Sequence, residues 1–279
     1  MKAVCDRHGA LLIFDEVMCG MGRTGTLHAW EHDGVVPDIQ AVGKGLGGGY
    51  VPISAVLVNE RVISAFKTNS QRFTHGQTYQ SHPLACAAAL EVQHILKDEN
   101  LVENVRIMGA YLERLLREHL GDHPNVGDIR GRGLFWAIEF VADKATKEPL
   151  DPALKVANKL HDKGMTKGYD VSIFHATGSA DGGLGGDHIL LAPPYIVQKS
   201  DVEEIVDRVR RVVEDVFAEL ACNRGDGHRA ARGNPEAQAA TLPVPTAQIV
   251  TGAGQPTRKP SDKLRAGSHQ KTMSGCVVT

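Results

Sequence analysis

Short apolar runs, interrupted by acids and glycines, mark the first part of the chain. The run Ala10–Phe14 ends at two acids, the first of which is Asp15, so it predicts a strand that delivers a carboxylate from its carboxyl end. A second apolar stretch leads from Asp38 into a glycine-rich turn that carries Lys44, and a third run follows at Ser54–Val58. The pattern predicts successive strands of an α/β protein with an acid and an amine at strand ends.

Farther along the chain, helical and extended patterns alternate. The expected helices are Pro83–Lys97, Leu101–Leu120, Pro152–Lys163 and a last helix that is opened by a capping box at Ser200–Glu203 and ends near Leu220. The expected extended segments are Gly133–Val141, Tyr169–His175 and Ile189–Val197. This order predicts a small α+β domain over residues 99–221, which follows an α/β part over residues 1–98.

Lys44 and Asp15 are the candidate chemical groups. A desolvated amine has a lowered pKa and a neutral nitrogen that attacks carbonyl carbons. We expect Lys44, held among glycines at a strand end, to be such a nucleophile, and together with the Asp15 carboxylate it suggests a bound carbonyl cofactor. A plain glycine turn with a solvated lysine stays open as the alternative.

Nucleotide-binding interpretations fail in their context. Gly43–Gly48 fits the G-x-G-x-x-G spacing by letter, but a dinucleotide fingerprint must open a helix, and here another apolar run follows directly. The acidic strand that ends at Asp15 is like that of a P-loop ATPase, yet the string G-x-x-x-x-G-K-[ST] does not occur in the sequence.

A third segment, Phe73–Leu90, is a further motif that, taken with two earlier ones, points to one protein family. With Phe14–Gly25 and Val42–Gly49 it resembles the class III aminotransferases, which are pyridoxal-phosphate enzymes of fold type I. The three motifs stand in the family's order and spacing, and the resemblance extends over about residues 1 to 220. Weaker similarities lie at Asp128–Leu134 and Asp187–Pro194.

The resemblance implies a role for each matching residue. Lys44 would form the internal Schiff base with pyridoxal 5'-phosphate and then move a proton, while Asp15 would keep the pyridine nitrogen protonated. Val17 would pack against a face of the cofactor ring. Thr78 would donate its hydroxyl to the cofactor phosphate, in this family usually across the interface of a homodimer. The partners implied are a small amine or amino acid and an oxo acid.

The start of the chain departs from the family. Met1–Ala10 is typical of a helix end and a turn, at a point that lies deep inside the family's large domain. By resemblance, the glycine-serine turn that holds the phosphate and the aromatic residue that stacks on the ring would precede it. We therefore expect an N-terminally truncated, impaired transaminase. The alternative function is that of an inactive aminotransferase-like fragment, or of a dimerisation or regulatory subunit.

One position bears on the substrate. Many family members bind a substrate α-carboxylate with an arginine before the Ala-Pro-Pro stretch, and here that position is Leu190. A leucine there favours amines or ω-amino acids over α-carboxylates, although Leu190 in a core strand is the equally open alternative.

Composition favours a cytoplasmic protein. The chain has 279 residues, a formal net charge of -2, 42% hydrophobic and 5% aromatic residues, and five cysteines without a C-x-x-C pair, which fits a reducing compartment. No signal peptide, membrane span or nucleic-acid pattern is visible. His28 and His32 resemble a pair on a helix surface without metal partners, so no metal is expected. Residues 222–279 are rich in Gly, Pro, Ala and Thr and predict a disordered tail.

Overall fold

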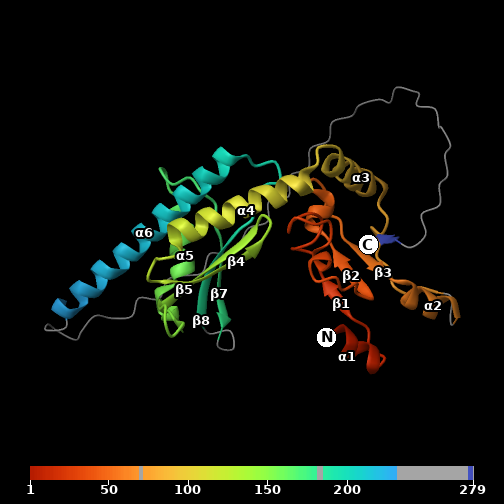
Figure 1. The fold of residues 1–279 in the computed structure, drawn as a ribbon, viewed down its shortest axis with the longest axis horizontal. Coiled ribbons are helices and arrows are strands. Elements are labelled where there is room, and N and C mark those ends of the chain that lie inside the picture. Colours follow the sequence, from red (N-terminus) through yellow and green to blue (C-terminus); the bar gives the residue numbers. More distant parts are fainter. Residues whose placement is uncertain (69–71, 181–184, 231–275, 279) are drawn as a thin grey trace, which may run out of the picture.

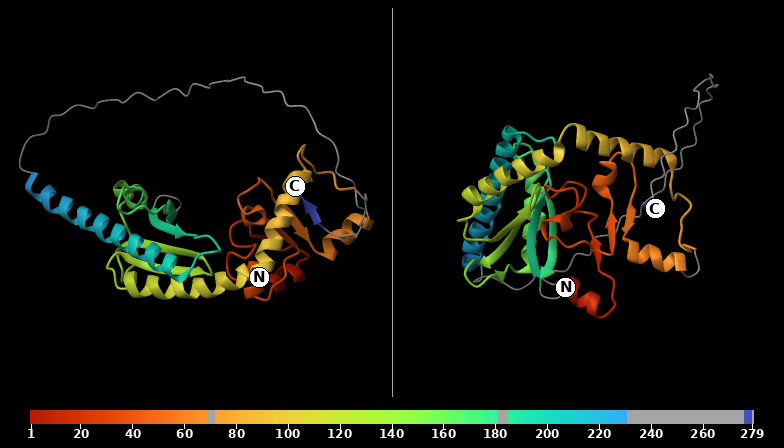
Figure 2. Two further views of the ribbon diagram at one scale, coloured as in Figure 1. Left: turned by 90° about the horizontal axis from the view of Figure 1, so that it is seen from above. Right: turned by 45° about the vertical axis from the view of Figure 1, so that its right-hand side comes forward.

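The computed structural model describes residues 1–68, 72–180, 185–230 and 276–278 (Figure 1). Two groups of elements lie side by side and are joined by the consecutive helices α3 and α4 (Figures 1 and 2). The first group, called the N-terminal lobe below, holds α1 (Lys2–Arg7), β1 (Ile13–Asp15), η1 (Ala29–His32), β2 (Ile39–Val42), η2 (Lys44–Gly47), β3 (Ala55–Val58), α2 (Glu60–Thr68) and α3 (Pro83–Asp98).

The second group, called the C-terminal lobe, contains helices that cover one side of an antiparallel sheet. Its elements are α4 (Leu101–Leu120), β4 (Val126–Arg132), β5 (Phe135–Asp143), β6 (Glu148–Pro149), η3 (Pro152–Leu154), α5 (Val156–Gly164), β7 (Phe174–Ala180), β8 (Gly185–Leu191) and α6 (Lys199–Ala230). The strand order is β4-β5-β8-β7, with β6 beside β5. Inward-facing Ile138, Phe140 and Ile189 pack with the apolar stripes of α4 and α6 in one large buried cluster.

The sheet of the N-terminal lobe has the order β1-β2-β3-β9. Strands β1 and β2 are parallel, β3 is antiparallel to β2, and β9 (Cys276–Val278) pairs antiparallel with the outer side of β3. Figure 1 shows β9, in blue, beside this lobe although it comes from the end of the chain. Within the part of the chain that the structure describes, no strand pairs with the outer side of β1.

The two faces of this sheet differ in how they are covered. Side chains alternate along a strand and directly paired residues share a face, so the strand register assigns each residue to a face. One face carries Val42 and Ala55 and packs against Met21 and Leu46. The other, which we call the open face, is formed by Ile13, Asp15, Ile39, Ala41, Val56 and Val58, and none of these six is buried.

Several predicted elements are confirmed. Helix α3 differs from its prediction by one residue, and α4 ends at Leu120 before Gly121 as expected. The predicted strands at Ala10–Phe14 and Ser54–Val58 are β1 and β3. The two helices could be predicted from their helical periodicity and clear stop signals, and the two strands from their short apolar runs.

Other predictions were wrong in detail. The last helix begins at Lys199, because the Gln198 N–H donates to the Asp201 carboxylate (2.8 Å) and so forms the cap two residues before the expected Ser200–Glu203 box. That helix also continues to Ala230, since no proline interrupts it near Leu220. The predicted helix Pro152–Lys163 is broken at Lys155, which has a positive φ of 49°.

Two extended segments were misplaced and several elements were missed. Strands β7 and β8 are shifted from the predicted Tyr169–His175 and Ile189–Val197, because pairing with β5 places the glycine-rich stretch before Ile189 inside the sheet. Sequence reasoning made no prediction for α2, β4, β6 or β9, and β9 lies inside the stretch that was predicted to be a disordered tail. Most of the predicted tail, residues 231–275 and 279, lies outside the described residues.

Candidate functional site

Adjacent parallel strands bring Asp15 and Lys44 to the same edge of the N-terminal sheet. Asp15 is the last residue of β1 and pairs in register with Ala41 of β2. Strand β2 ends one residue later, and Lys44 opens η2 two residues beyond that end. Because the carboxyl ends of parallel strands meet at one edge, a carboxylate and an amine gather there, as the sequence predicted.

The Lys44 turn is backbone-strained and tightly packed. Lys44 has a φ of +41°, a left-handed conformation that is uncommon for a residue with a side chain and costs on the order of 1 kcal/mol. Glycines on either side allow close approach: a Cβ on Gly45 would lie 3.3 Å from the Tyr195 hydroxyl, and one on Gly47 would lie 2.8 Å from Ile53. The turn is therefore held in one conformation by its neighbours.

Val17 completes this edge of the sheet. Its backbone N–H donates to the Asp15 Oδ1 atom at 3.0 Å, which leaves Oδ2 free for another partner. A Cβ built on Gly43 would lie 3.5 Å from the Val17 side chain. Asp15, Val17 and the Lys44 turn thus come together, as expected from the D-E-V and glycine motifs.

Glu16, beside Asp15, has a different environment. Its side chain is 3% exposed and accepts hydrogen bonds from the Ala29 and Trp30 N–H groups at 2.8 and 2.7 Å and from the Gln40 amide at 2.8 Å. A buried carboxylate with three donors is a structural anchor. Glu16 fixes the loop after β1 to strand β2, and sequence reasoning did not assign it this role.

One expectation about Lys44 is not met. The sequence predicted a desolvated amine, but Lys44 and Asp15 are both exposed. The physical reason is that the open face, which carries Asp15, has no covering layer among the described residues. Asp15 and Lys44 therefore lie at the ends of neighbouring strands, but both side chains are exposed to solvent.

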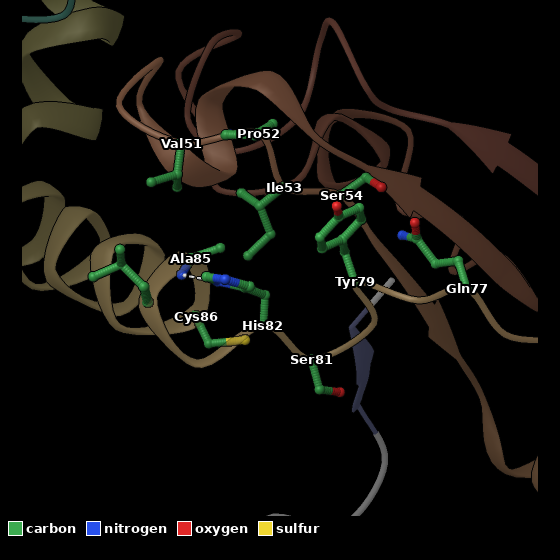
Figure 3. Close-up of a pocket in the computed structure, with 11 residues that line it drawn as sticks. Val51, Pro52, Ile53, Ser54, Gln77, Tyr79, Ser81, His82, Ala85 and Cys86 are labelled. Atoms are coloured by element: carbon green, nitrogen blue, oxygen red, sulfur yellow. Dashed lines mark hydrogen bonds between the residues drawn. The ribbon is translucent and has the colours of Figure 1, made fainter. Parts of the chain in front are cut away.

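Thr78 is exposed in a turn just before α3, and among the described contacts none joins it to Asp15 or Lys44. Its neighbours line a pocket of about 610 Å³, into which the side chains shown in Figure 3 project from two segments. The lining residues are Val51, Pro52, Ile53, Ser54, Gln77, Tyr79, Ser81, His82, Leu84, Ala85 and Cys86.

A joint between the lobes holds the loop that follows Asp15. Arg23 Nη1 donates to the carbonyl oxygens of Leu134 (3.0 Å) and Pro193 (2.6 Å), and its guanidinium lies 4.5 Å from the centre of the Tyr195 ring. The Tyr195 hydroxyl donates to the Met21 carbonyl at 3.0 Å. Burial lowers the pKa of Arg23 and raises that of Tyr195. The Gly-Arg-Thr-Gly string at the end of the Phe14–Gly25 motif could have signalled Arg23, but sequence reasoning did not single it out, and nothing in the sequence signalled Tyr195.

The prediction for the histidine pair was only partly right. His28 caps the short helix η1, stacks on Trp30 with ring centres 5.6 Å apart and bonds to the Gln40 amide at 2.9 Å. His32 Nε2 lies 3.1 Å from the Thr24 carbonyl. His28 therefore holds a loop, whereas His32 lies exposed at the end of the short helix η1. In the described chain no group of three or more His, Cys, Asp or Glu side chains is placed to hold a metal ion.

Leu190, the candidate specificity position, lies half-buried on β8. It pairs with Ala137 of β5 and Phe174 of β7, on the side of the sheet opposite the buried Ile189. It lines a cavity of about 400 Å³ together with His161, Ser172, Ile173, Phe174, His175 and Ala192.

Among the described helices, none combines the length and apolar character that a bilayer span requires.

Comparison with known proteins gives one consistent answer. The family model described as Aminotransferase class-III matches residues 1–213. An aminotransferase of Gibberella zeae is 54% identical over 213 residues, which are 76% of this chain and 41% of that protein. The gamma aminobutyrate transaminase 2 of Solanum lycopersicum is 34% identical over 218 residues, 77% of this chain and 45% of that protein.

Solved structures agree with the sequence relatives. A thermostable (S)-enantioselective omega-transaminase from Thermomicrobium roseum superposes with a TM-score of 0.68 at 37% identity, over 77% of this chain and 45% of that one. The fold is therefore that of the fold type I transaminases, as predicted. The chain spans less than half the length of each of these three proteins.

Proposed function

Because this chain belongs to the class III aminotransferases, we propose that it carries the lysine and the ring-binding carboxylate of a pyridoxal-phosphate-dependent transaminase site. The observation that supports this most is the strand register, which puts Asp15 and the strained Lys44 turn at the carboxyl ends of adjacent parallel strands. The donor set fits the cofactor: an amine for its aldehyde, a carboxylate for its ring nitrogen and an aliphatic side chain for its ring face.

Each side chain would have one task. Lys44 Nζ would hold the cofactor's aldehyde carbon until the substrate amine replaces it there, and the freed Lys44 amine would then take the proton from the substrate α-carbon. Asp15 Oδ2 would hold a proton at the ring nitrogen, while Oδ1 stays bound to the Val17 N–H. When bound, pyridoxal phosphate supplies an electron-poor ring that stabilises the charge left by that proton. Glu16 would keep Asp15 in position through its three hydrogen bonds.

Thr78 would serve a second copy of the site. No described contact joins its exposed turn to Asp15 or Lys44, which leaves the hydroxyl able to donate to the cofactor phosphate held by a partner subunit. A homodimer is thus part of the proposal. The amino donor we propose is an amine or ω-amino acid, because Leu190 offers no charge to an α-carboxylate.

Cofactor capture tests the site. The 279-residue chain is mixed with pyridoxal phosphate, reduced with borohydride and digested, and the labelled lysine is found by mass spectrometry. We expect the label at Lys44, its loss in Lys44→Ala, and its retention in Lys97→Ala, which removes another exposed lysine. Arginine at position 44 cannot replace the amine, because its guanidinium stays protonated.

The strength of capture is part of the prediction. Because Lys44 and Asp15 are exposed, we expect weak binding and slow amino transfer by the chain alone. A label on a different lysine contradicts the assignment. No label at any cofactor concentration favours the alternative of a non-catalytic subunit.

A further inference from the structure

A buried polar network lies on the face of the N-terminal sheet that is opposite the open face. Its centre is Gln40 of β2, which is 4% exposed and projects to the same side of the strand as Val42. The Gln40 amide contacts Glu16 Oε2 at 2.8 Å, the Trp30 indole nitrogen at 3.2 Å and His28 Nδ1 at 2.9 Å. One amide thus joins β2 to the loop after β1 and to η1.

The neighbours of Gln40 allow one orientation of its amide. An indole N–H can only donate, so Trp30 requires the amide oxygen. The Glu16 carboxylate only accepts, so it requires the amide nitrogen. The second hydrogen of that nitrogen is then donated to His28 Nδ1, which has to be an unprotonated acceptor. His28 is therefore neutral in this network and carries its proton on Nε2.

A proton on His28 Nδ1 is incompatible with this arrangement. It would set an N–H donor against the NH₂ donor of Gln40. Turning the amide over does not help, because the amide oxygen would then face the Glu16 carboxylate and the amide nitrogen would face the Trp30 N–H. Protonation therefore breaks at least one hydrogen bond around two buried side chains, Gln40 and Glu16.

The surroundings of His28 contain two carboxylates and one thiol. His28 lines a cavity of about 220 Å³, and the other lining residues, from β2, β3, η2, α3 and nearby loops, are uncharged. Cys86 of α3 is the titratable group among them. Glu16 shares the Gln40 amide with His28, and Glu31 of η1 accepts from the His28 backbone N–H at 2.7 Å. Of these types of group, an imidazole is the one that ordinarily changes its charge between about pH 5 and pH 8.

Glu16 connects this network to Asp15. The Glu16 N–H donates to the Ala41 carbonyl at 2.9 Å and its side chain accepts from Gln40, so β2 holds both its main chain and its side chain. Asp15 and Val17 flank it in sequence, and the Val17 N–H donates to Asp15 Oδ1 at 3.0 Å. A shift of Glu16 therefore moves the carboxylate at the sheet edge.

We propose that Gln40 is a positioning residue for Asp15, that it acts through Glu16, and that it does so only while His28 is neutral. A neutral His28 leaves the amide fixed by all three neighbours. A protonated His28 displaces the amide, Glu16 loses one of its three donors, and the Asp15 carboxylate is no longer held in one position. That Asp15 binds a cofactor ring rests on the proposed function, whereas the network itself does not.

NMR spectroscopy of the full chain, without cofactor, tests the network. The chemical shifts of the His28 ring nitrogens identify the tautomer, and we expect the proton on Nε2. The sample is then titrated from about pH 8 to about pH 5, the range in which imidazoles change their charge. The hydrogen-exchange protection of the Ala29 and Trp30 amides, which donate to Glu16, should fall about tenfold with the midpoint of the His28 titration.

The Val17 amide proton reports on Asp15 directly, because it is bonded to Asp15 Oδ1. Its chemical shift should change with the same midpoint as the His28 ring. A glutamine with only a general structural role would not tie the Asp15 hydrogen bond to the titration of one histidine.

Two matched pairs of variants assign the effect. Gln40→Met keeps the length of the side chain and removes its amide, and Gln93→Met makes the same change on α3. His28→Phe keeps an aromatic ring without a titratable nitrogen, and His94→Phe makes that change at an exposed histidine of α3. We expect Gln40→Met and His28→Phe to abolish the pH-dependent step at Val17 and both controls to retain it. Circular dichroism confirms that each variant is folded.

A proton on His28 Nδ1 at neutral pH overturns the proposal. So does a Val17 step that persists in Gln40→Met or His28→Phe, or a step whose midpoint differs from that of His28. If Gln40→Met does not fold, the tautomer and the steps in the wild-type and His28→Phe chains decide. These measurements contain no cofactor, so their outcome is independent of the Lys44 labelling test of the proposed function.

Discussion

At the scale of single residues, Asp38 is the carboxylate that ties β1, α1 and β3 together. It is 1% exposed and accepts from the Leu12 N–H at 2.8 Å, from the Asn59 amide at 2.8 Å and from the Lys2 ammonium at 3.2 Å. These donors, the Leu12 N–H first among them, lower the pKa of Asp38 to about 2. The ionised form is therefore favoured in the folded lobe.

This shift predicts acid sensitivity. A carboxyl whose folded pKa lies below its unfolded value of about 3.9 stabilises the fold above that value and loses the effect as pH falls through the folded pKa. We expect the contribution of Asp38 to disappear between about pH 4 and pH 2. In Asp38→Asn, urea midpoints should be lower at neutral pH and should change less within that window. Asp122→Asn, an exposed site in the C-terminal lobe, is the control and should behave as the wild type.

The pair of acids Asp15 and Glu16 could be identified from the sequence, but not which of the two is exposed and which is buried. Two acids at the end of an apolar run have to be either solvated or paired with hydrogen-bond donors. In the structure Asp15 is solvated, whereas Glu16 is buried and accepts from three donors. Which acid takes which role depends on Ala29, Trp30 and Gln40. These residues lie 13 to 24 positions away and no local pattern links them to Glu16.

At the scale of elements, Gly109 is a helix position at which the close approach of a neighbouring turn requires glycine. It lies inside α4, where glycine is less favourable than alanine by about 1 kcal/mol. A Cβ there would lie 2.3 Å from the carbonyl oxygen of Gly133 in the β4–β5 turn. Gly133 in turn has a φ of +57° and would clash with the Thr24 backbone at 2.5 Å if it had a Cβ.

We therefore expect Gly109→Ala to destabilise the chain although it raises helix propensity. The overpacking cost is about 1–3 kcal/mol. Ala110→Gly, at the exposed neighbouring position, should cost only about 1 kcal/mol through propensity. Urea unfolding followed by circular dichroism compares the two. A Gly109→Ala protein as stable as the wild type would show that the turn moves aside freely.

Element prediction succeeded where the chain's own periodicity decides the structure. α3 and α4 carry their signals within the segment: a proline in the first turn of one and a glycine after the other. β8 does not, because Gly185–Asp187 has no strand propensity and is extended through pairing with β5. Asp187 can be buried in that strand only because its carboxylate accepts from the Ala157 N–H (3.0 Å) at the start of α5, 30 residues away.

At the scale of the whole molecule, Arg23 connects the lobes. Its guanidinium satisfies two carbonyl oxygens of the C-terminal lobe, and the Leu134 N–H donates back to the Arg23 carbonyl at 3.1 Å. Arg23→Met leaves both carbonyl oxygens without this donor, which should lower the free energy of unfolding by about 2 kcal/mol or more. Arg106→Met, which removes an exposed arginine from α4, is the matched control.

The two tryptophans report on the lobes separately. Trp30 lies in the N-terminal lobe and Trp136 in the C-terminal lobe, so single-tryptophan versions give one signal for each. In the Arg23→Met background we expect the Trp30 signal to unfold at lower urea than the Trp136 signal. With Arg106→Met the two midpoints should stay as in the wild type. Coincident midpoints in Arg23→Met would mean that other contacts couple the lobes.

The unequal cores have a consequence for synthesis. A ribosome releases the N-terminal lobe first, but that lobe has the small core and is held by hydrogen bonds with Leu134, Pro193 and Tyr195, which are translated later. Until the C-terminal lobe has emerged, the Arg23 guanidinium lacks the Leu134 and Pro193 carbonyl oxygens to which it donates in the folded chain. We therefore expect the segment that is made first to complete its folding last, after the C-terminal lobe has formed.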